Sequence, residues 1–318
     1  MGVRFISEVR QNKFGICDMN VKELVQALSY VRRFSGETIL IKLGGSILDE
    51  ENSLKGLCSD MSLLRAVGVS LLIVHGGSKA INAAFDRYCF PIEFQNGSRV
   101  TSPEAMDVIE SVLSGQVNKS LVRNLHAVSI RAIGLSGVDN RLLQCRAVSD
   151  ELGRVGEIVE VNVEWLRQLL ESQSEANAGM VPVISSVGID DEGKSYNVNA
   201  DWAACRIAAE MKIKKVIYLT DQNGICDRDG KVFSKLNPER MRALKEDGIV
   251  QGGMLAKVDT ILSALSLGVE HIQVINGKSP HSLIEELFTD RGSGTLCLNE
   301  IKMERIDEFI DKSYIERK

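Results

Sequence analysis

The strongest constraint on the fold is a series of short apolar runs that recur along the chain. They are near-continuous rather than alternating, which is typical of strands buried on both faces of a parallel sheet. The runs occupy residues 38–43, 70–75, 130–135, 181–187, 215–220 and 271–275. Helical patterns lie between them, for example over 104–126 and 255–267. The sequence therefore predicts an α/β protein with an open, mainly parallel sheet sandwiched by helices.

Three segments depart from this alternation. Residues 20–33 space their apolar side chains as a helix does, ahead of the first strand. This helix cannot bury its stripe alone, so we expect it to pack on the body of the chain or on another subunit. Short β-rich pieces over 145–162 predict a hairpin. Residues 300–318 have a loosely helical pattern from which no function can be read.

Composition narrows the class of protein. The chain has 318 residues, of which 44% are hydrophobic and 25% charged, as in soluble globular proteins. Its net charge of -5 provides no general field to attract nucleic acid or an anionic membrane. No apolar run approaches the roughly 20 residues of a membrane span. The seven cysteines show no C-x-x-C spacing, which fits reduced thiols in the cytoplasm. We expect a cytoplasmic protein with no nucleic-acid or membrane partner.

Polar or glycine-rich clusters follow strand after strand. They read "KLGGS", "VHGGS", "SYNVNAD", "LTDQNG" and, opening a later helix, "QGGMLAK". Ligands of open parallel sheets bind at the carboxyl ends of the strands, where such clusters meet. They would offer backbone amides, Lys42, Lys257 and Asp201 around one edge, which suits a phosphorylated ligand. The G-K-S at 277–279 is not a P-loop, because Ile272 stands where the motif needs glycine.

These motifs together resemble the amino acid kinase family, from about residue 20 to residue 297. The resemblance is carried, in the family's order, by "TILIKLGGS", "GSRVTSPEAMDVIESVLSGQVNK", "DELGRVGEI", "NVNAD", "LTDQNGI" and "GGMLAKV". Within the family the chain looks most like the branch that phosphorylates the side-chain carboxylate of N-acetyl-L-glutamate with MgATP, in arginine biosynthesis. A carboxylate is already ionised at neutral pH, so such a reaction needs charge stabilisation and positioning rather than a general base.

The resemblance implies three catalytic residues. Lys42 would stabilise the transferring phosphoryl group, and Lys257 would be the second cation, placed toward the leaving β-phosphate. Asp201 would orient the two lysines. Each residue also has a purely structural alternative. Lys42 could be a lysine that extends to solvent from a strand end, and Lys257 an exposed lysine on a helix surface. Asp201 could cap the following helix.

Other positions are implied to bind the two substrates. Gly76 and Gly77 would contact substrate and phosphoryl group through their amides, Arg99 would bind a carboxylate, and Asn197 would bind the substrate. A surface arginine in a hairpin is the alternative for Arg99. The resemblance assigns ATP binding to Gly44, Gly45, Thr220, Asp221, Gly252, Gly253 and Met254. No protein metal site is expected, since Mg²⁺ would arrive on the nucleotide phosphates.

The first segment and "HSLIEELFTDRGSGT" resemble the arginine-inhibited, hexameric branch of the family. Tyr30, Glu286 and Gly292 match positions implicated in arginine binding there, although a tyrosine on an amphipathic helix more often packs. The resemblance implies a homo-oligomer, built as a dimer or a trimer of dimers. A PII-type regulator is a possible partner.

Some positions depart from the family pattern. Ser78 replaces a third glycine, Trp202 replaces a small residue, and Ser29 replaces a proline. We expect His75 to have a structural role, because the reaction needs no base. Two alternatives stay open: a related kinase acting on another acidic amino acid, and an arginine- or nucleotide-sensing ring in which Ser78 has weakened catalysis.

The resemblance also suggests a division of the chain. An N-terminal extension with the regulatory helix is followed by a lobe for the acylated amino acid, an ATP-binding lobe and a tail. These parts are residues 1–36, 37–207, 208–299 and 300–318.

Overall fold

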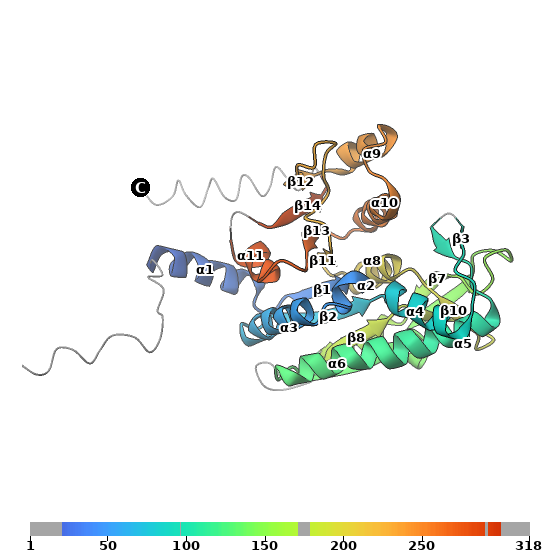
Figure 1. Cartoon of the computed structure of the whole chain (residues 1–318). Coiled ribbons are helices and arrows are strands. Elements are labelled where there is room, and N and C mark those ends of the chain that lie inside the picture. Colours follow the sequence, from blue (N-terminus) through green and yellow to red (C-terminus); the bar gives the residue numbers. More distant parts are fainter. Residues whose placement is uncertain (1–20, 96, 171–178, 290–291, 300–318) are drawn as a thin grey trace, which may run out of the picture.

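The computed structural model describes residues 21–95, 97–170, 179–289 and 292–299, and the statements below concern those ranges. An eight-stranded sheet forms the centre of the molecule (Figure 1). In spatial order its strands are β12 (Lys235–Leu236), β14 (Gly294–Leu298), β13 (His271–Asn276), β11 (Lys215–Thr220), β1 (Thr38–Leu43), β2 (Ser70–His75), β8 (Val181–Ser185) and β5 (Ala132–Ser136). All neighbours are parallel except β13 and β14. The predicted mainly parallel α/β fold is confirmed.

Helices cover both faces of this sheet. One core contains apolar side chains of α3 (Glu51–Ala66), α6 (Asn118–Ala127) and α11 (Ser282–Phe288). The core on the opposite face contains those of α7 (Val163–Leu170), α8 (Ala200–Met211), α9 (Pro238–Glu246) and α10 (Gly252–Ser266). A smaller core joins α4 (Ser78–Tyr88) to α5 (Pro103–Glu110). The remaining helices are α1 (Val21–Phe34) and the short α2 (Gly45–Leu48).

The alternation of side chains along β1 determines where Lys42 points. Ile39, Ile41 and Leu43 belong to the core with α3, α6 and α11, whereas Leu40 belongs to the core with α8 and α10. Successive side chains of a strand face opposite sides, so Lys42 shares the face of Leu40. The strand pattern therefore directs Lys42 toward α8 and α10.

Two smaller sheets lie beside the main one. The first has the order β10 (Ser195–Asn197), β9 (Val187–Ile189), β6 (Leu143–Ala147) and β7 (Gly156–Val161). Its antiparallel β6 and β7 confirm the predicted hairpin. The second is the hairpin of β3 (Phe94–Gln95) and β4 (Ser98–Arg99).

Two sequence expectations about strands were wrong. The run at 181–187 is not one strand, because the chain leaves the main sheet after β8 and continues as β9 in the second sheet. The carbonyl of Ser186, between the two, accepts a hydrogen bond from the Val198 amide at 3.1 Å. Strand β14 was not predicted, because GTLCL is only a short apolar run after a glycine-rich stretch.

The long predicted helix over 104–126 is present but not uniform. It runs as α5, a π-helical segment (Ser111–Val117) and α6 without interruption. The predicted N-terminal helix is confirmed as α1. The predicted tail at 300–318 lies outside the described residues.

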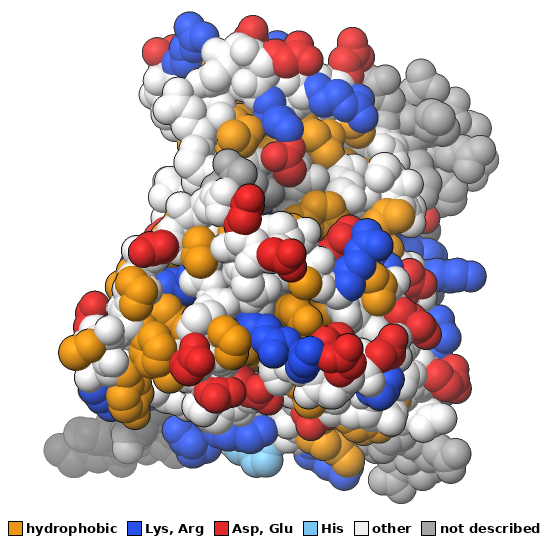
Figure 2. Space-filling view, turned by 90° about the vertical axis from the view of Figure 1, so that its right-hand side faces the viewer, with side chains coloured by type: hydrophobic (Ala, Val, Ile, Leu, Met, Phe, Trp, Pro, Cys, Tyr) orange, Lys and Arg blue, Asp and Glu red, His pale blue; other side chains and the backbone are white. Residues whose placement is uncertain are grey.

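The outline of the molecule shows a smaller upper part joined to a broader lower part through a narrower middle (Figure 2). The upper part contains α9 and α10, as Figure 1 shows. The main sheet runs through both parts because β11 pairs with β1. The predicted boundary at 207/208 falls within α8, and the division into lobes stays a prediction. No helix in the described ranges has the length and apolar character to span a membrane.

Candidate active site

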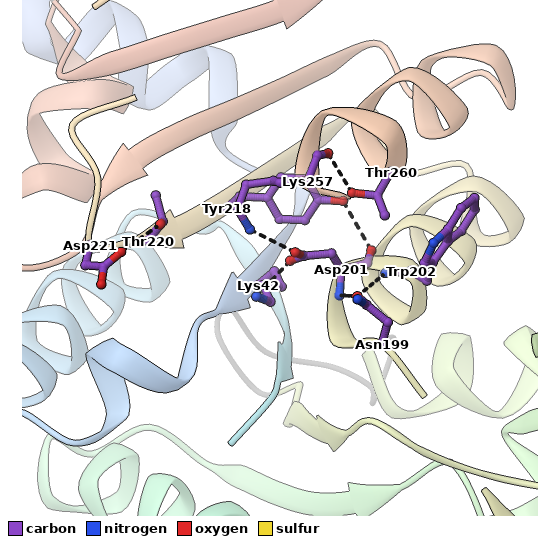
Figure 3. Close-up of polar contacts among 9 residues, drawn as sticks. All are labelled: Lys42, Asn199, Asp201, Trp202, Tyr218, Thr220, Asp221, Lys257 and Thr260. Atoms are coloured by element: carbon purple, nitrogen blue, oxygen red, sulfur yellow. Dashed lines mark hydrogen bonds and ion pairs between the residues drawn. The ribbon is translucent and has the colours of Figure 1, made fainter. Parts of the chain in front are cut away.

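Three charged side chains from three elements meet on the face of the sheet that Lys42 faces (Figure 3). Lys42 is the next-to-last residue of β1, Asp201 lies in the first turn of α8, and Lys257 lies in α10. Lys42 Nζ is 2.7 Å from Asp201 Oδ1, and Lys257 Nζ is 2.8 Å from Asp201 Oδ2. One carboxylate therefore holds two ammonium groups, one on each oxygen. This is the arrangement expected for residues that orient two cations toward one phosphate.

Burial makes this cluster electrostatically strong. Both lysines are 8% exposed. Burial lowers the pKa of Lys42, Asp201 opposes this shift, and the like charge of Lys257 adds to it. Burial alone would raise the pKa of Asp201, but the charges of Lys42 and Lys257 outweigh it and hold that pKa below its usual range. The aspartate is thus ionised at neutral pH.

The start of α8 is fixed independently of the cluster. Asn199 caps this helix, because its Oδ1 accepts hydrogen bonds from the amides of Asp201 at 2.8 Å and Trp202 at 3.3 Å. The alternative reading of Asp201 as the cap is therefore wrong. Tyr218, in β11, donates from its hydroxyl to the Asp201 carbonyl at 3.3 Å. The Lys257 ammonium lies 5.4 Å from the centroid of the same Tyr218 ring.

A cavity of about 600 Å³ opens beside the cluster. Its walls include most of the side chains and glycines for which the sequence predicted catalysis or substrate binding. These are Lys42, Gly76, Gly77, Arg99, Asn197 and Asp201, and Gly45, which was predicted to bind ATP, lines the cavity as well. Ser78 and Trp202, which depart from the family pattern, line the same cavity. A volume of this size suits a small organic ligand.

Arg99 is not the surface arginine of the alternative reading, since it is only 6% exposed. Its Nη2 donates to Asn82 Oδ1 at 2.5 Å, and its guanidinium lies over the rings of Phe85 and Phe94. Its buried Nη1 has no hydrogen-bond partner among the described residues. Since Arg99 lines the cavity, this donor is suited to an anionic group of a ligand.

The two glycine clusters after β1 and β2 meet at this edge. A Cβ on Gly45 would lie 3.2 Å from the amide nitrogen of Ser78. A Cβ on Gly77 would lie 2.8 Å from Leu113 Cδ2, in the π-helical segment. A side chain at 77 would have to displace Leu113 and Val117, so the π-helical segment lies close against the backbone there. Helix α4 starts at Ser78, so its positive end is at the cavity wall.

The residues expected to bind ATP lie outside this cavity, apart from Gly45. The Gly44 amide donates a hydrogen bond to the Leu219 carbonyl oxygen at 3.1 Å. Thr220 ends β11 and Asp221 follows it, on the far side of Lys42 from Trp202 (Figure 3). The other candidates, Gly252, Gly253 and Met254, form the first turn of α10. The structure places them at two element ends next to the cluster and does not join them in one pocket.

The regulatory candidates lie at the opposite edge, around α1 and α11. The ring of Phe34 in α1 meets the ring of Phe288 in α11 edge-on, with centroids 6.1 Å apart. Glu286 accepts from the Ser293 amide at 2.6 Å, and its Oε2 would lie 3.2 Å from a Cβ on Gly292. Tyr30 packs on the adjacent core, as expected for a tyrosine on an amphipathic helix. The structure brings Glu286 and Gly292 together and places Tyr30 on the neighbouring helix.

Several residues of the site were not predicted. Asn199 stands in the quoted "NVNAD" motif, and its place before a helix could have identified it as the cap. Tyr218 and Asn118 support the site through hydrogen bonds that no local motif signals. Phe94 lines the cavity from the β3–β4 hairpin that also carries Arg99, and no sequence pattern indicated its role there. In the described ranges, no group of three or more His, Cys, Asp or Glu side chains could hold a metal ion.

The fold and this cluster of two lysines on one aspartate define a class of phosphoryl-transfer proteins. The model of the amino acid kinase family matches residues 37–276, and the chain belongs to this family. Among solved structures of lower identity, carbamate kinase from Giardia lamblia bound to AMP-PNP shares the fold, with a TM-score of 0.59 and 11% identity over 83% of this chain and 99% of that chain.

Its relatives indicate the particular enzyme. Acetylglutamate kinase from Campylobacter curvus (strain 525.92) is 43% identical over 274 residues, covering 86% of this chain and 95% of that protein. The enzyme of that name from Clostridioides difficile (strain 630) is 38% identical, covering 87% and 96%. N-acetylglutamate synthase from Neisseria gonorrhoeae, solved with coenzyme A and N-acetyl-glutamate, has a TM-score of 0.79 and 25% identity over 89% of this chain and 64% of that one. The same synthase has also been solved with L-arginine, at a TM-score of 0.75.

Proposed function

We propose that this chain is an acetylglutamate kinase, which transfers the γ-phosphoryl group of MgATP to the side-chain carboxylate of N-acetyl-L-glutamate. The observation that carries the proposal is the pair of buried lysines held by Asp201 at the wall of a cavity of about 600 Å³. The relatives at 38% to 43% identity support the choice of substrate.

The charged and polar groups at the cavity, together with Lys257 beside it, would have distinct roles in this reaction. The nucleophile is an ionised carboxylate, so the chain must offset the repulsion between two anions rather than remove a proton. Lys42 and Lys257 would neutralise the phosphoryl group as it moves, and Asp201 would keep both ammonium groups in place. Arg99 would bind the other carboxylate of the substrate, and Asn197 would contact the substrate from β10. The Gly77 amide would donate to the phosphoryl oxygens, whereas the Gly76 amide already donates to the Leu43 carbonyl at 3.3 Å.

The nucleotide would lie on the α10 side, between the strand end at Thr220 and the helix start at Gly252. Because these candidates do not line the cavity, we propose that residues 208–299 close onto residues 37–207 when both substrates are bound. MgATP would bind as a substrate, with the metal ion carried by its phosphates. The only acidic side chain of the cluster, Asp201, is already occupied by the two lysines.

A coupled assay of ADP release tests the proposal and its rivals together. We expect turnover with N-acetyl-L-glutamate and little with glutamate, aspartate or aminoadipate. Activity with unacetylated acidic amino acids alone would favour a related kinase. Absence of activity with every substrate, together with binding of arginine or nucleotide, would favour a sensing protein and reject the proposal.

We predict that Arg99→Met raises KM for acetylglutamate by about 10- to 100-fold, the loss of one charge-assisted pair, and leaves KM for ATP unchanged. Methionine keeps the apolar packing on Phe85 and Phe94 but removes the free donor. The matched control is Arg141→Met, since Arg141 forms an exposed ion pair with Asp191. Equal changes in both KM values would show that Arg99 has no specific role in substrate binding.

We further propose that arginine inhibits the enzyme by binding near α1 and α11. Glu286 supplies a carboxylate suited to a guanidinium or an α-amino group. Nearby Lys215 is half-buried, and burial lowers its pKa to about 8, with Glu286 opposing the shift. Its Nζ lies 4.7 Å from the Phe34 ring centroid in α1. The solved complex of the related synthase with L-arginine supports this choice of effector.

The remaining proposals concern assembly and location. We propose a homo-oligomer, as a dimer or a trimer of dimers in which α1 links dimers, in the cytoplasm. A PII-type protein remains a proposed regulator. The amphipathic α1, whose Leu28 is 52% exposed, is the surface that motivates the assembly.

We predict that Glu286→Gln raises the arginine concentration for half-inhibition by about tenfold or more, because the variant loses one charged contact. Without arginine its kcat should equal that of the wild type. Deleting residues 1–35 should abolish inhibition and reduce the particle size in light scattering. The control is Glu285→Gln, one residue away on α11. Inhibition that is unchanged in Glu286→Gln and in the deletion would reject this site.

A further inference from the structure

The buried histidine at the end of β2 is used by none of the roles above. His75 is 0% exposed. Its Nδ1 lies 3.0 Å from the carbonyl oxygen of Gly76, and its Nε2 lies 3.0 Å from Nδ2 of Asn118. Asn118 is also 0% exposed and is the first residue of α6, directly after the π-helical segment. The ring therefore bridges the helix and the glycine turn at the cavity.

The surroundings of Asn118 determine which way its amide points. Its Nδ2 donates to the carbonyls of Leu135 at 3.2 Å and Val183 at 2.8 Å. Its Oδ1 accepts from Lys119 Nζ at 3.2 Å. The atom that faces His75 is thus a hydrogen-bond donor, and a second donor on Nε2 would repel it. Nε2 of His75 consequently carries no proton.

The ring is neutral with its proton on Nδ1, from which it donates to the Gly76 carbonyl. Burial, helped by the positive charges of Lys119 and Lys42 and opposed by the hydrogen bond to Gly76, lowers the pKa of His75 to about 4. These two lysines are the charged groups that act on the ring from the elements around it. Its protonation state is then constant across the pH range in which enzymes are usually assayed.

The geometry of the Gly76–Gly77 peptide links the His75 contact with the Gly76 carbonyl to the direction of the Gly77 N–H. No described peptide bond is cis, so the C=O of Gly76 and the N–H of Gly77 point in opposite directions across one plane. The carbonyl points to the buried ring of His75, and both glycines line the cavity. The Gly77 N–H is therefore directed to the cavity side. Leu113 and Val117 pack against Gly77 and leave its backbone little room to turn.

We propose that His75 is a positioning residue, whose Nδ1–H fixes the Gly76–Gly77 peptide so that the Gly77 amide faces the transferring phosphoryl group. Asn118 selects the tautomer that makes this possible. The inference rests on the proposed kinase function. It gives His75 a role in the reaction that involves no proton transfer.

The first test reads the tautomer in the wild-type protein. The full chain, labelled with ¹⁵N-histidine, is observed by NMR without substrate, and the spectrum of His75→Asn assigns the signal. We expect a protonated Nδ1 and an unprotonated Nε2, with no titration from about pH 6 to about pH 9. A protonated Nε2, or a ring that titrates in this range, would overturn the proposal whether or not the chain is active.

The second test separates the donor from the ring. The side-chain nitrogen of asparagine takes the place of Nδ1, so His75→Asn keeps a donor for Gly76, whereas His75→Leu has none. We expect His75→Leu to lower kcat on the order of 10²-fold, as a misplaced catalytic group does, with both KM values within about threefold. His75→Asn should recover most of this loss and keep the wild-type pH profile.

The outcomes are distinct. Equal losses in both variants at wild-type thermal stability, or a wild-type kcat in His75→Leu, would overturn the positioning role while leaving the kinase function in place. A pH-rate limb that disappears in His75→Asn would identify proton transfer instead. If His75→Leu does not fold, the NMR result and the kinetics of His75→Asn decide the question.

Discussion

Replacing either lysine of the cluster is expected to reduce kcat by about 10²- to 10³-fold, the effect of removing one preorganised charge contact to a transition state. Lys42→Met and Lys257→Met keep most of each side-chain stem and remove the ammonium group. Both lysines bind the same carboxylate, so each variant leaves Asp201 with one partner and a compensated charge. The folded structure should therefore survive, and the loss should appear in kcat. Steady-state kinetics with N-acetylglutamate and MgATP measure it.

The two variants should differ in one respect. Lys42 lines the cavity and Lys257 does not, so Lys257→Met should raise KM for ATP more than KM for acetylglutamate. The matched control is Lys55→Met, in which an exposed ion pair with Glu51 on α3 is removed. The proposed chemistry would be rejected if Lys42→Met or Lys257→Met kept kcat within about threefold of Lys55→Met, far less than a lost charge contact costs.

The meeting of Lys42, Asp201 and Lys257 was predictable because each signal was local. Lys42 ends an apolar strand, Asp201 opens a helix after "NVNA", and Lys257 follows "GGM". Parallel strands place all such ends at one edge of the sheet, so separation in sequence did not matter. The period-2 pattern of β1 also decides which face Lys42 takes. The same patterns gave the order of the strands along the chain and the class of the fold.

What could not be predicted depends on contacts between distant segments. Asn118 looks like an ordinary polar residue in a helix, yet it bonds to His75 and to the carbonyls of Leu135 and Val183. Its role depends on the π-helical turn before it, which no residue pattern signals. The buried state of Arg99 likewise depends on Phe85 in α4 and Phe94 in β3, which meet it only in the folded chain.

Asp201→Asn should be the most damaging single substitution in the protein. It leaves two buried ammonium groups without a counter-charge, a change that typically costs about 3 to 5 kcal/mol of folding free energy. It should also abolish measurable turnover, since the lysines repel each other and leave their positions. Denaturant unfolding at fixed protein concentration measures the first effect. Asp191→Asn, in an exposed pair with Arg141, is the control and should change stability by less than about 1 kcal/mol.

The pH dependence of the Asp201→Asn effect has a definite sign. The lysines hold the folded pKa of Asp201 below its unfolded value of about 3.9. The stabilisation is therefore complete above that value and is lost as the pH falls toward the folded pKa. The difference in unfolding free energy between wild type and Asp201→Asn should be largest near neutral pH and should shrink in acid. A difference that is constant with pH would show that the aspartate is not stabilised by charge.

A combined variant separates the stability of the cluster from its chemistry. Lys42→Met, Asp201→Asn and Lys257→Met together leave no unpaired charge, and a neutral replacement of a buried ion cluster is often as stable as the original. We expect this triple variant to recover most of the stability that Asp201→Asn loses and to remain inactive. Recovery of stability without activity would mean that the three charges are retained for phosphoryl transfer rather than for folding. A triple variant as unstable as Asp201→Asn would instead mean that the cluster is needed to join α8 and α10 to β1.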